Sequence, residues 1–364
     1  MKTIAQKLLD WFQINRRELP WRNTNDPYAI WVSEVMLQQT QVNTVIPYYE
    51  RFLDNFPDIT ILAKAHSDQV LKMWEGLGYY ARAINLQKAS KMVVNRFSAQ
   101  VPSDPSQFKE LPGVGDYINA AVQSIAFGHS MAVVDGNVRR VLSRLYEMPE
   151  TVNESKYSKK FANKAQSLIC KKSPGDYNQA IMELGALICI PKNPQCNMCP
   201  LTKNCKSFIH DTIFNFPRRK KKSAVPTQNW VAAVIQKDNK FLLTQRKAGG
   251  FLGGLWEFPG GKICDNEPLQ SACIRHIQEQ LQINIQIKQH ISQIKHKYTH
   301  FSQIMDAFLC DFQSGTIHLN GPSNYKWIYW SEIDQFALPK SNLKFIKEIS
   351  KNKKMGNFFF KKTI

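Results

Sequence analysis

Leu111-Pro-Gly-Val-Gly115 is a short turn between two predicted helices, the second an apolar helix from Tyr117 to Phe127. Glycines in such a turn let another backbone approach closely, and the backbone N–H groups at the start of the second helix can bind a phosphate. This helix-hairpin-helix pattern indicates contact with a nucleic-acid backbone. A Gly-x-Gly pattern by itself more often marks an ordinary helical turn, so the interpretation depends on the residues around it.

Outward from this turn, Asp135 stands twenty residues after Gly115, within Val133-Val-Asp-Gly-Asn-Val138. It opens a helix predicted from Arg139 to Tyr146. An aspartate at the start of a helix is commonly a simple N-cap. A catalytic interpretation of Asp135 therefore requires a second carboxyl group.

Glu34 supplies that second carboxyl group, within Trp31-Val-Ser-Glu-Val-Met-Leu-Gln-Gln-Thr40. Three of its four neighbours at helical spacing are apolar, so it lies on a mostly buried stripe. Burial raises the pKa of a carboxyl group, and we expect Glu34 to act as a protonated general acid. Cleavage of a glycosidic bond needs such an acid to protonate the leaving group, together with an ionised carboxylate beside the sugar, which becomes positively charged in the transition state. Asp135, which would remain ionised at the helix N-terminus, fits the second role. The alternative is a buried glutamate that only bridges helices.

Four cysteines lie close together in the loop at 189–205, in the pattern Cys189-x6-Cys196-x2-Cys199-x5-Cys205. Four thiolates at this spacing suit either a tetrahedral zinc ion or an iron–sulfur cluster. Zinc sites usually pair two short Cys-x2-4-Cys units, and this loop has one, which favours iron–sulfur without deciding it. The remaining cysteines are interpreted as small buried hydrophobic residues: Cys170, Cys264, Cys273 and Cys310.

The length of 364 residues and the change in residue pattern along the chain predict two domains. Residues 1–216 show helical periodicity and almost no strand signals, which predicts an all-α domain. Residues 217–228 combine prolines with five consecutive basic residues and are expected to form an exposed linker. β-Branched and aromatic runs at 229–348, interrupted by one helical stretch from Pro268 to Leu281, predict an α+β domain. A basic tail is expected at 349–364.

Lys and Arg outnumber Asp and Glu by 48 to 29, a net charge of +19. Such an excess predicts a polyanionic partner, because each neutralised phosphate releases condensed counterions. A solvated basic surface or an anionic membrane face would also account for the charge. The sequence has no amphipathic lipid-binding stretch and no apolar run of membrane length, and its first residues show neither an apolar h-region nor a cleavage site. We therefore expect a cytoplasmic protein that binds nucleic acid.

The order and spacing of these motifs resemble the endonuclease III superfamily of DNA glycosylases over the first 205 residues. Within that superfamily, three segments are similar to the MutY family: Leu19-Pro-Trp-Arg22, Ser33-Glu-Val-Met-Leu-Gln-Gln-Thr-Gln41 and Gly76-Leu-Gly-Tyr-Tyr-Ala-Arg82. In a lyase-active cousin, a lysine two residues after the hairpin glycine forms a Schiff base with the sugar. Tyr117 occupies that position here, which implies base removal without strand cleavage. The family's cysteine loop holds a [4Fe-4S] cluster, and the resemblance implies that cofactor.

The resemblance also implies roles for individual residues. Glu34 would protonate adenine at N7, and Asp135 would stabilise the oxocarbenium-like sugar while water attacks. Asn137 and Tyr117 would help to hold Asp135 and the sugar. Aromatic and apolar wedge residues must offset the cost of flipping the adenine out of the stack. The residues implied in DNA and base binding in this domain are Trp21, Arg22, Leu37, Gln39, Tyr79, Arg82, Gly113, Gly115, Gln179 and Met182, with Gln39 and Tyr79 beside the 8-oxoguanine.

The second domain resembles the Nudix fold through Phe258-Pro-Gly-Gly-Lys262, followed by Glu267 and Arg275. In the Nudix box, glutamates hold Mg²⁺ for pyrophosphate hydrolysis. Here His276 replaces one glutamate, and Glu279-Gln280 replaces an acidic pair, so we expect no hydrolysis.

The domain is similar instead to the 8-oxoguanine-recognition domain of the MutY family. That family's Phe-Ser-His loop appears here as Tyr298-Thr299-His300, and Thr299 and His300 would read the modified base. An ordinary loop between strands is the alternative interpretation.

These inferences predict a multi-domain protein, with an all-α helix-hairpin-helix glycosylase domain that carries an iron–sulfur loop, followed by an α+β Nudix-like domain. The predicted function is monofunctional removal of adenine mispaired with 8-oxoguanine or guanine in double-stranded DNA, as part of base excision repair. We expect a monomer associated with the nucleoid. Three competing functions are a bifunctional glycosylase/lyase, a free-nucleotide Nudix hydrolase, and a non-catalytic DNA-binding or redox-sensing protein.

Overall fold

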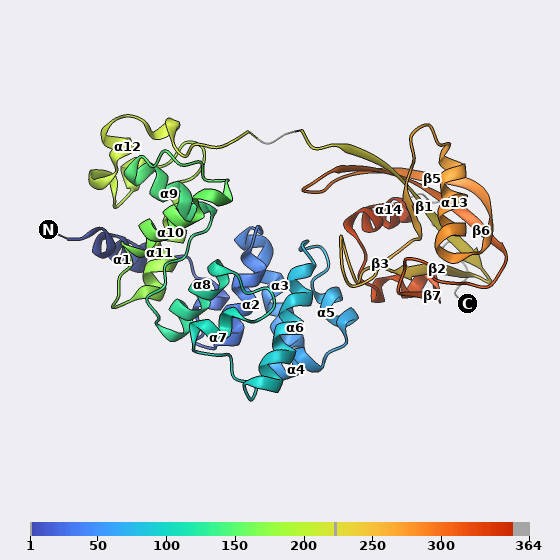
Figure 1. Ribbon diagram of the computed structural model, residues 1–364, viewed down its shortest axis with the longest axis horizontal. Coiled ribbons are helices and arrows are strands. Elements are labelled where there is room, and N and C mark those ends of the chain that lie inside the picture. The colour runs from blue at the N-terminus through green and yellow to red at the C-terminus, as the bar shows by residue number, and fades with distance from the viewer. Residues whose placement is uncertain (1, 222–223, 352–364) are drawn as a thin grey trace. The chain divides into compact units, whose positions relative to one another are not determined.

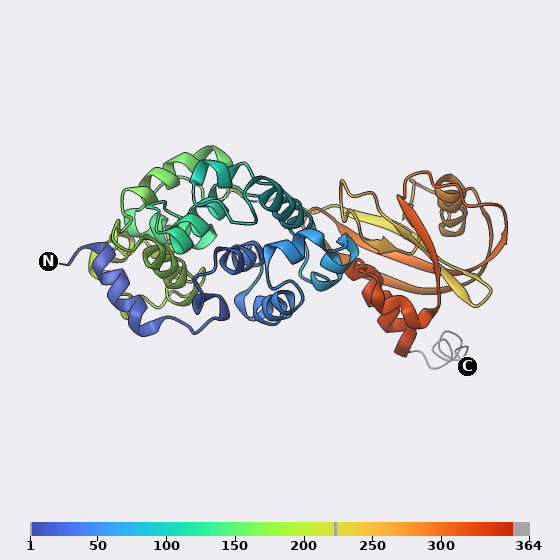
Figure 2. The same ribbon diagram turned by 90° about the horizontal axis from the view of Figure 1, so that it is seen from below.

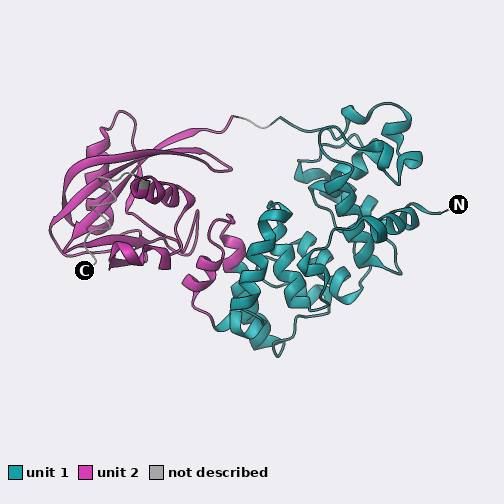
Figure 3. Cartoon of the chain, turned by 180° about the vertical axis from the view of Figure 1, so that it is seen from behind, with its two compact units in different colours: residues 1–64, 85–222 teal, residues 65–84, 223–364 magenta. Residues whose placement is uncertain are grey.

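The computed structural model describes residues 2–221 and 224–351 (Figure 1). The chain divides into two compact units, coloured separately in Figure 3. Unit 1 comprises residues 1–64 and 85–222, and unit 2 comprises residues 65–84 and 223–364. None of the helices in the described ranges has the length and apolar composition that a membrane span requires.

Unit 1 is helical, and no strand occurs among its described residues. The prediction of an all-α first part is confirmed. The helices up to the hairpin are α1 (Ile4–Asn15), α2 (Pro27–Leu37), α3 (Val42–Asn55), α4 (Ile59–Lys64), α6 (Ala81–Arg96, which begins in unit 2) and α7 (Pro105–Lys109). Those that follow are α8 (Asp116–Phe127), α9 (Gly136–Tyr146), α10 (Ser158–Gln166), α11 (Pro174–Leu187) and α12 (Lys206–Ile209). Unit 1 also has short 3-10 helices, one before α2 at Pro20–Arg22 and the others at Ser155–Tyr157, Cys196–Met198, Thr202–Asn204 and Ile213–Asn215.

The predicted hairpin joins α7 to α8. Gly113 has φ +81°, and a Cβ there would lie 2.8 Å from Cβ of Asn85, so the turn requires glycine. Gly115 is the N-cap of α8 and has open space where a side chain would project. The helix-hairpin-helix motif is therefore present as predicted, with the N-terminus of α8 accessible.

Helix α11 packs closely against α8 and α9 through two glycines. A Cβ at Gly175 would lie 2.7 Å from the backbone oxygen of Ser124 on α8. A Cβ at Gly185 would lie 2.7 Å from Cβ of Asn137 on α9. These contacts bring three helices around one hydrophobic core, and they fix the position of Asn137 beside α11.

Unit 2 contains α5 (Ser67–Met73) and a mixed seven-stranded sheet. The strand order is β3-β2-β1-β6-β5, with β4 paired to β1 and β7 paired to β2; β1 and β6 are parallel and the other pairs are antiparallel. The strands are β1 (Thr227–Lys237), β2 (Lys240–Gln245), β3 (Trp256–Glu257), β4 (Gly260–Lys262), β5 (Asn284–Lys297), β6 (Ser302–Ser314) and β7 (Asn324–Ile328), with a 3-10 helix at Trp330–Gln335.

A helix covers each face of this sheet, as Figures 1 and 2 show. Residues of β1 alternate between the two faces, with Val234 in the core beneath α14 (Lys340–Lys351) and Ile235 in the core beneath α13 (Leu269–Leu281). The predicted α+β domain and its helix at Pro268–Leu281 are confirmed.

Helix α14 was not predicted, because Pro268–Leu281 was the one helical stretch expected in the second domain. Phe345 and Ile349 recur four residues apart and are buried in the sheet's core, while Lys347 between them is exposed. Residue 349 thus belongs to the domain and not to the tail, whose residues 352–364 lie outside the described residues.

Candidate active site

Glu34 is carried into the interior by α2. Asp26 caps this helix by accepting hydrogen bonds from two backbone N–H groups of the first turn, at 3.0 and 3.3 Å. The helix is buried from Tyr28 to Met36, because it packs on every side. Only 4% of Glu34 is exposed, and its predicted burial is confirmed.

Burial raises the pKa of Glu34 from 4.5 to about 7, because the charged carboxylate is poorly solvated there. The Tyr117 hydroxyl acts in the opposite direction by donating a hydrogen bond of 2.6 Å to Glu34 Oε2. Asp135 raises the pKa further, and Arg22 lowers it. The predicted rise is confirmed, so protonated and ionised forms of Glu34 coexist at neutral pH.

Asp135 is the N-cap of α9, where its carboxylate accepts a hydrogen bond of 2.7 Å from the backbone N–H of Val138. Burial raises the pKa of Asp135, while hydrogen bonds from Val138 and Asn137, together with Arg140, lower it less strongly. The helix N-terminus was expected to keep Asp135 charged. Desolvation is the larger effect and acts against that expectation.

Asn137 connects Asp135 to the core of unit 1. Its Oδ1 accepts a hydrogen bond of 2.8 Å from the guanidinium of Arg140, which also donates to the backbone oxygens of Gly185 and Cys189 at 2.7 Å each. Arg140 is buried, so these bonds fix the orientation of Asn137. The Asn137 side chain is then placed to hydrogen-bond the carboxylate of Asp135.

Glu34 and Asp135 line one cavity of about 140 Å³ in unit 1. This volume is below the ~300–1,000 Å³ of sites for drug-sized ligands and suits a single planar base. The hydroxyl of Tyr117 hydrogen-bonds Glu34, whereas the resemblance implied that Tyr117 helps to hold Asp135 and the sugar. The other predicted residues that line this cavity are Trp21, Arg22, Leu37, Asn137, Gln179 and Met182.

The polar wall of this cavity contains two residues that the sequence analysis missed, Glu183 and Arg17. Burial opposes ionisation of Glu183, but hydrogen bonds from Arg17 and Arg22 outweigh it and hold the pKa of this carboxyl at about 2. Both arginines lie within 3.2 Å of its oxygens. Arg22 Nε also donates to Gln179 Oε1 at 3.1 Å. The spacing of Gln179 and Glu183, four residues apart on α11, was the available signal.

The four cysteines of the predicted metal loop lie between α11 and α12 and are partly buried. Three of them, Cys189, Cys199 and Cys205, pack against the hydrophobic core of unit 1. Cys189, Cys196 and Cys205 all act, after burial, to raise the pKa of the Cys199 thiol, so the four are neighbours. As they stand, no three His, Cys, Asp or Glu side chains in the described ranges form a group that could hold a metal ion.

Two residues implied in recognition of 8-oxoguanine meet in unit 2. The hydroxyl of Tyr79 hydrogen-bonds the hydroxyl of Thr299 at 2.8 Å, although 220 residues separate them. Thr299 and His300 are exposed in the turn between β5 and β6, and Tyr79 is 42% exposed. Their polar groups are therefore accessible to a ligand.

Gln39 and Tyr79 share an unusual backbone conformation, with φ of 57° and 48°. Positive φ is uncommon in residues other than glycine and occurs preferentially at functional sites. Gln39 is exposed in the turn after α2. Arg82 contacts its own turn, donating to the Gly78 oxygen at 3.0 Å and lying over the rings of Trp74 and Tyr79.

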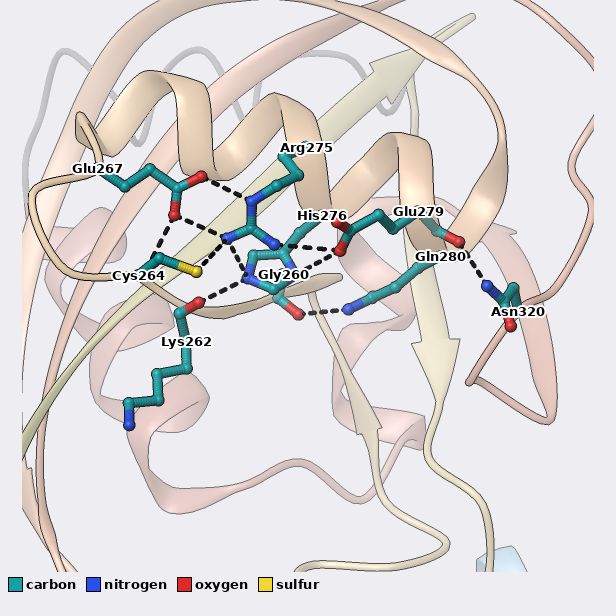
Figure 4. Close-up of polar contacts among 9 residues, drawn as sticks. All are labelled: Gly260, Lys262, Cys264, Glu267, Arg275, His276, Glu279, Gln280 and Asn320. Carbon is teal, nitrogen blue, oxygen red and sulfur yellow. Dashed lines mark hydrogen bonds and ion pairs between the residues drawn. The ribbon is translucent and has the colours of Figure 1, made fainter.

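The residues of the predicted Nudix box are shown in Figure 4. Arg275 binds Glu267 through two bonds of 2.6 and 2.7 Å, and Glu279 through one of 3.1 Å. One arginine therefore engages both remaining carboxylates of the box.

His276 and Gln280 occupy the positions at which the box pattern has glutamates. The Nε2 atom of His276 lies 2.8 Å from the backbone oxygen of Lys262, and Gln280 Nε2 donates to that of Gly260 at the same distance. Both side chains thus bind the β4 backbone (Figure 4), a contact that carboxylates could not make.

Comparisons with known proteins agree with both parts of this architecture. The family model of the HhH-GPD superfamily base excision DNA repair proteins matches residues 32–167. The NUDIX domain model matches residues 230–348. A solved thermostable thymine-DNA glycosylase is similar to 57% of the chain and covers 95% of its own length, with 30% sequence identity and a TM-score of 0.52.

Curated relatives match along nearly the whole chain. The adenine DNA glycosylase of Buchnera aphidicola from Schizaphis graminum is 32% identical over 338 residues, covering 92% of this chain and 95% of that protein. The human adenine DNA glycosylase is 31% identical over 387 residues, covering 91% of this chain and 71% of that protein. With its two matched domains and with relatives of this identity along nearly its whole length, the chain belongs to the adenine DNA glycosylase family.

Proposed function

We propose that this protein removes adenine from double-stranded DNA where the adenine is mispaired with 8-oxoguanine or guanine, by hydrolysing its N-glycosidic bond. The observation that carries the proposal is the joint placement of Glu34 and Asp135 in one base-sized cavity, with the pKa of Glu34 at about 7. Such a pair provides a proton for the leaving base and a negative charge for the sugar.

Glu34 would act as the general acid. The hydroxyl of Tyr117 donates its hydrogen to Glu34 Oε2, so a proton carried by Glu34 would reside on Oε1. From there it would pass to N7 of adenine, which weakens the bond between the base and C1′. A higher pKa increases the protonated fraction but weakens the acid, so a pKa near the working pH gives the best product of the two.

Asp135 would stabilise the oxocarbenium-like sugar as the base departs. The N–H of Val138 and the side chain of Asn137 favour its ionised form, which opposes the effect of burial. A positive charge on the sugar adds to this preference, because opposite charges attract strongly in a desolvated cavity. A water molecule would then attack C1′.

The chemistry would stop at base removal. A lyase reaction requires an amine that forms a Schiff base with the sugar, and Tyr117 occupies the position after the hairpin where the lyase-active cousin has lysine. No lysine is among the described residues that line the cavity. The product would therefore be an abasic site in an intact strand.

The flipped adenine would occupy the cavity between α2 and α11. Arg22 donates to Gln179 Oε1, which leaves the Gln179 amino group to donate to a ring nitrogen of adenine. Trp21, Leu37 and Met182 line the same cavity and would contact the faces and edges of the base. Burial of these apolar surfaces offsets the cost of unstacking.

Recognition of the opposite base would use Gln39, Tyr79, Thr299 and His300. The hydrogen bond between Tyr79 and Thr299 holds two hydroxyls together at an exposed position, where they can bind the polar edge of 8-oxoguanine. The positive φ of Gln39 and Tyr79 places both side chains on sharp turns. The DNA backbone would be bound at Gly113 and Gly115. Arg82 would contribute to this binding by fixing the conformation of the turn that precedes it.

The four loop cysteines would hold a [4Fe-4S] cluster. Four soft sulfur donors fit iron–sulfur ligation, and Arg144 Nη1, 3.4 Å from Cys189 Sγ, would offset the negative charge of a thiolate-ligated group. The loop has one short Cys-x2-Cys unit, whereas zinc sites usually pair two such units, and this favours a cluster over zinc. The cluster would be structural, since the loop contributes no residue to the cavity.

The partner would be double-stranded DNA, bound by a monomer at the nucleoid. The net charge of +19 supports an electrostatic contribution to that binding. Because such binding weakens steeply with salt, we expect the affinity for a mispaired duplex to fall as ionic strength rises.

A duplex with 8-oxoguanine opposite adenine tests the proposal. We expect a nick at the adenine that appears only after alkali, and we expect Glu34→Gln or Asp135→Asn to abolish it. Glu50→Gln and Asp54→Asn, exposed on α3, are matched controls that should retain full activity. Full activity in Glu34→Gln would refute the acid role, and a nick without alkali would refute the hydrolytic one.

A further inference from the structure

Unit 2 contains a cavity that the proposed glycosylase chemistry does not use. Its volume is about 430 Å³, within the ~300–1,000 Å³ typical of small-molecule sites. It lies beside β1, β3 and β4, next to the residues drawn in Figure 4. The residues that carry the inference are Trp230, Arg246, Lys247, Phe251, Glu257 and Lys262.

Two aromatic rings line this cavity. The ring of Trp230 stacks on that of Phe301, with centroids 6.3 Å apart and planes at 14°. Phe251 packs edge-on against Tyr298 at 5.0 Å and still has 42% of its surface exposed. An exposed ring at the wall of a cavity can stack on a planar ligand.

The rim of the cavity is positively charged. Lys247 and Lys262 are exposed, and neither has an ion-pair partner in the part of the chain that the structure describes. The guanidinium of Arg246, by contrast, binds both carboxylate oxygens of Glu257, at 2.9 and 2.7 Å. Two cations thus remain for an anionic group at the entrance.

A smaller chamber of about 20 Å³ adjoins the cavity and shares Trp230, Arg246, Phe251 and Glu257 with it. Gln303 lines this chamber and is only 7% exposed. Its Oε1 is buried and has no hydrogen-bond partner among the described residues. Because an unmatched buried acceptor is costly, this oxygen is available to an N–H donor that reaches the chamber.

We propose that this cavity binds a guanine nucleotide. The base would stack between Trp230 and Phe251, with its adjacent N–H donors directed at Gln303 Oε1 and the Glu257 carboxylate. Its carbonyl edge would accept from Arg246, and the phosphate would bind Lys247 and Lys262. Guanine fits because it presents two neighbouring donors on one edge, whereas adenine presents only its amino group.

The bound nucleotide would not be hydrolysed. His276 and Gln280, where the box pattern has metal-binding carboxylates, are held by the backbone oxygens of Lys262 and Gly260. Glu267 is engaged by Arg275 in a two-bond ion pair. The site would thus be a binding site and not a second active site, and it is independent of the proposed glycosylase function.

Isothermal titration calorimetry of the full chain with dGMP, without divalent cations, tests the proposal. We expect saturable binding of one dGMP, weaker binding of dAMP and of deoxyguanosine, and weaker binding still of inorganic phosphate. Lys262→Glu should weaken dGMP binding at least about fivefold, from one lost ion pair. Lys288→Glu, an exposed lysine on β5 outside the lining, is the matched control and should bind normally.

Gln303→Leu separates base recognition from phosphate binding. It should weaken dGMP binding about tenfold, through loss of one hydrogen bond, and leave inorganic phosphate binding unchanged, with the circular dichroism spectrum confirming the fold. Gly249→Glu, at a position where an added Cβ meets no atom within 4 Å, should also weaken dGMP binding, by charge repulsion at the rim. No saturable binding of dGMP, equal binding by Lys262→Glu, or equal affinity for dAMP would overturn the proposal.

Discussion

Replacing Tyr117 by phenylalanine removes one hydroxyl from the candidate active site and tests the acid role of Glu34. That hydroxyl donates to Glu34 Oε2 at 2.6 Å and lowers the pKa of Glu34, because an ionised carboxylate accepts a hydrogen bond more strongly than a neutral carboxyl does. Loss of the hydroxyl should therefore raise the pKa of Glu34 above its value of about 7.

The size of this rise follows from the strength of one hydrogen bond. A hydrogen bond to a charged group contributes about 1.5–3 kcal/mol, and one pH unit corresponds to about 1.4 kcal/mol. The neutral carboxyl also accepts a bond from the hydroxyl, although a weaker one, so the lower end of the range applies. We expect the pKa of Glu34 in Tyr117→Phe to be about one pH unit higher.

The measurement is the single-turnover rate of adenine release from an 8-oxoguanine:adenine duplex as a function of pH. A reaction that needs a protonated acid slows as pH rises through the pKa of that acid. The fall should be centred near pH 7 in the natural protein and about one pH unit higher in the variant. The position of the fall is the readout, because the maximal rate also depends on packing.

Met182→Leu is the control for this experiment. The Tyr117 hydroxyl also contacts Met182 Sδ at 3.5 Å, so this substitution alters the surroundings of the hydroxyl while leaving its bond to Glu34 intact. The fall in rate should stay near its original pH. If the fall in Tyr117→Phe stayed in place or moved to lower pH, the hydrogen bond would not be acting on the catalytic acid, and the assignment of Glu34 would be refuted.

Four further outcomes are expected. Glu34 is neutral in the folded and unfolded chains below pH 4.5, and the rise of its pKa to about 7 on folding costs about 3 kcal/mol of stability once both forms are ionised. Glu34→Gln should therefore raise the free energy of unfolding, measured by urea denaturation, by up to that amount at alkaline pH and change it little at acid pH. Glu183, with its pKa lowered to about 2, stabilises the fold above pH 4.5 and loses this effect as the pH falls toward 2. Glu183→Gln should lower the free energy of unfolding by about 3 kcal/mol at pH 7, because it leaves two arginines without a charged partner. Cys199→Ser should reduce bound iron and the visible absorption band, whereas Cys264→Ser, exposed and outside the loop, should keep both. Thr299→Ala should reduce the preference for 8-oxoguanine over guanine opposite adenine several-fold in competition assays, and an unchanged preference would exclude Thr299 from recognition.

The sequence predicted the features that depend on local pattern. The burial of Glu34 followed from apolar neighbours at helical spacing, and the hairpin followed from two glycines, one of which has the positive φ that requires glycine. The α+β character of the second domain followed from β-branched and aromatic runs, one of which forms β1. These are properties of short segments, and they do not depend on where a segment lies in the folded protein.

Properties that depend on distant partners could not be predicted. The ion pair of Arg17 and Glu183 joins residues 166 positions apart, and neither segment has a sequence pattern that indicates the other. The same holds for Tyr117, whose hydroxyl donates to Glu34, 83 positions away. The rise in the pKa of Asp135 depends on how completely neighbouring helices exclude water, which a helix N-cap pattern does not reveal.

Burial is the largest cause of the raised pKa of Glu34, and Glu183 binds cations that would otherwise oppose it. Both carboxyls line one cavity, and burial alone would raise the pKa of each. Arg22 lies near both, but its guanidinium donates to both oxygens of Glu183, at 3.1 and 3.2 Å, and its effect on the pKa of Glu34 is the smallest of the four causes. Because Glu183 holds this cation, and Arg17 as well, Glu34 is left with a tyrosine as its hydrogen-bond donor. A full ion pair would hold its pKa low, so the capture of the arginines by Glu183 is what allows Glu34 to carry a proton at neutral pH.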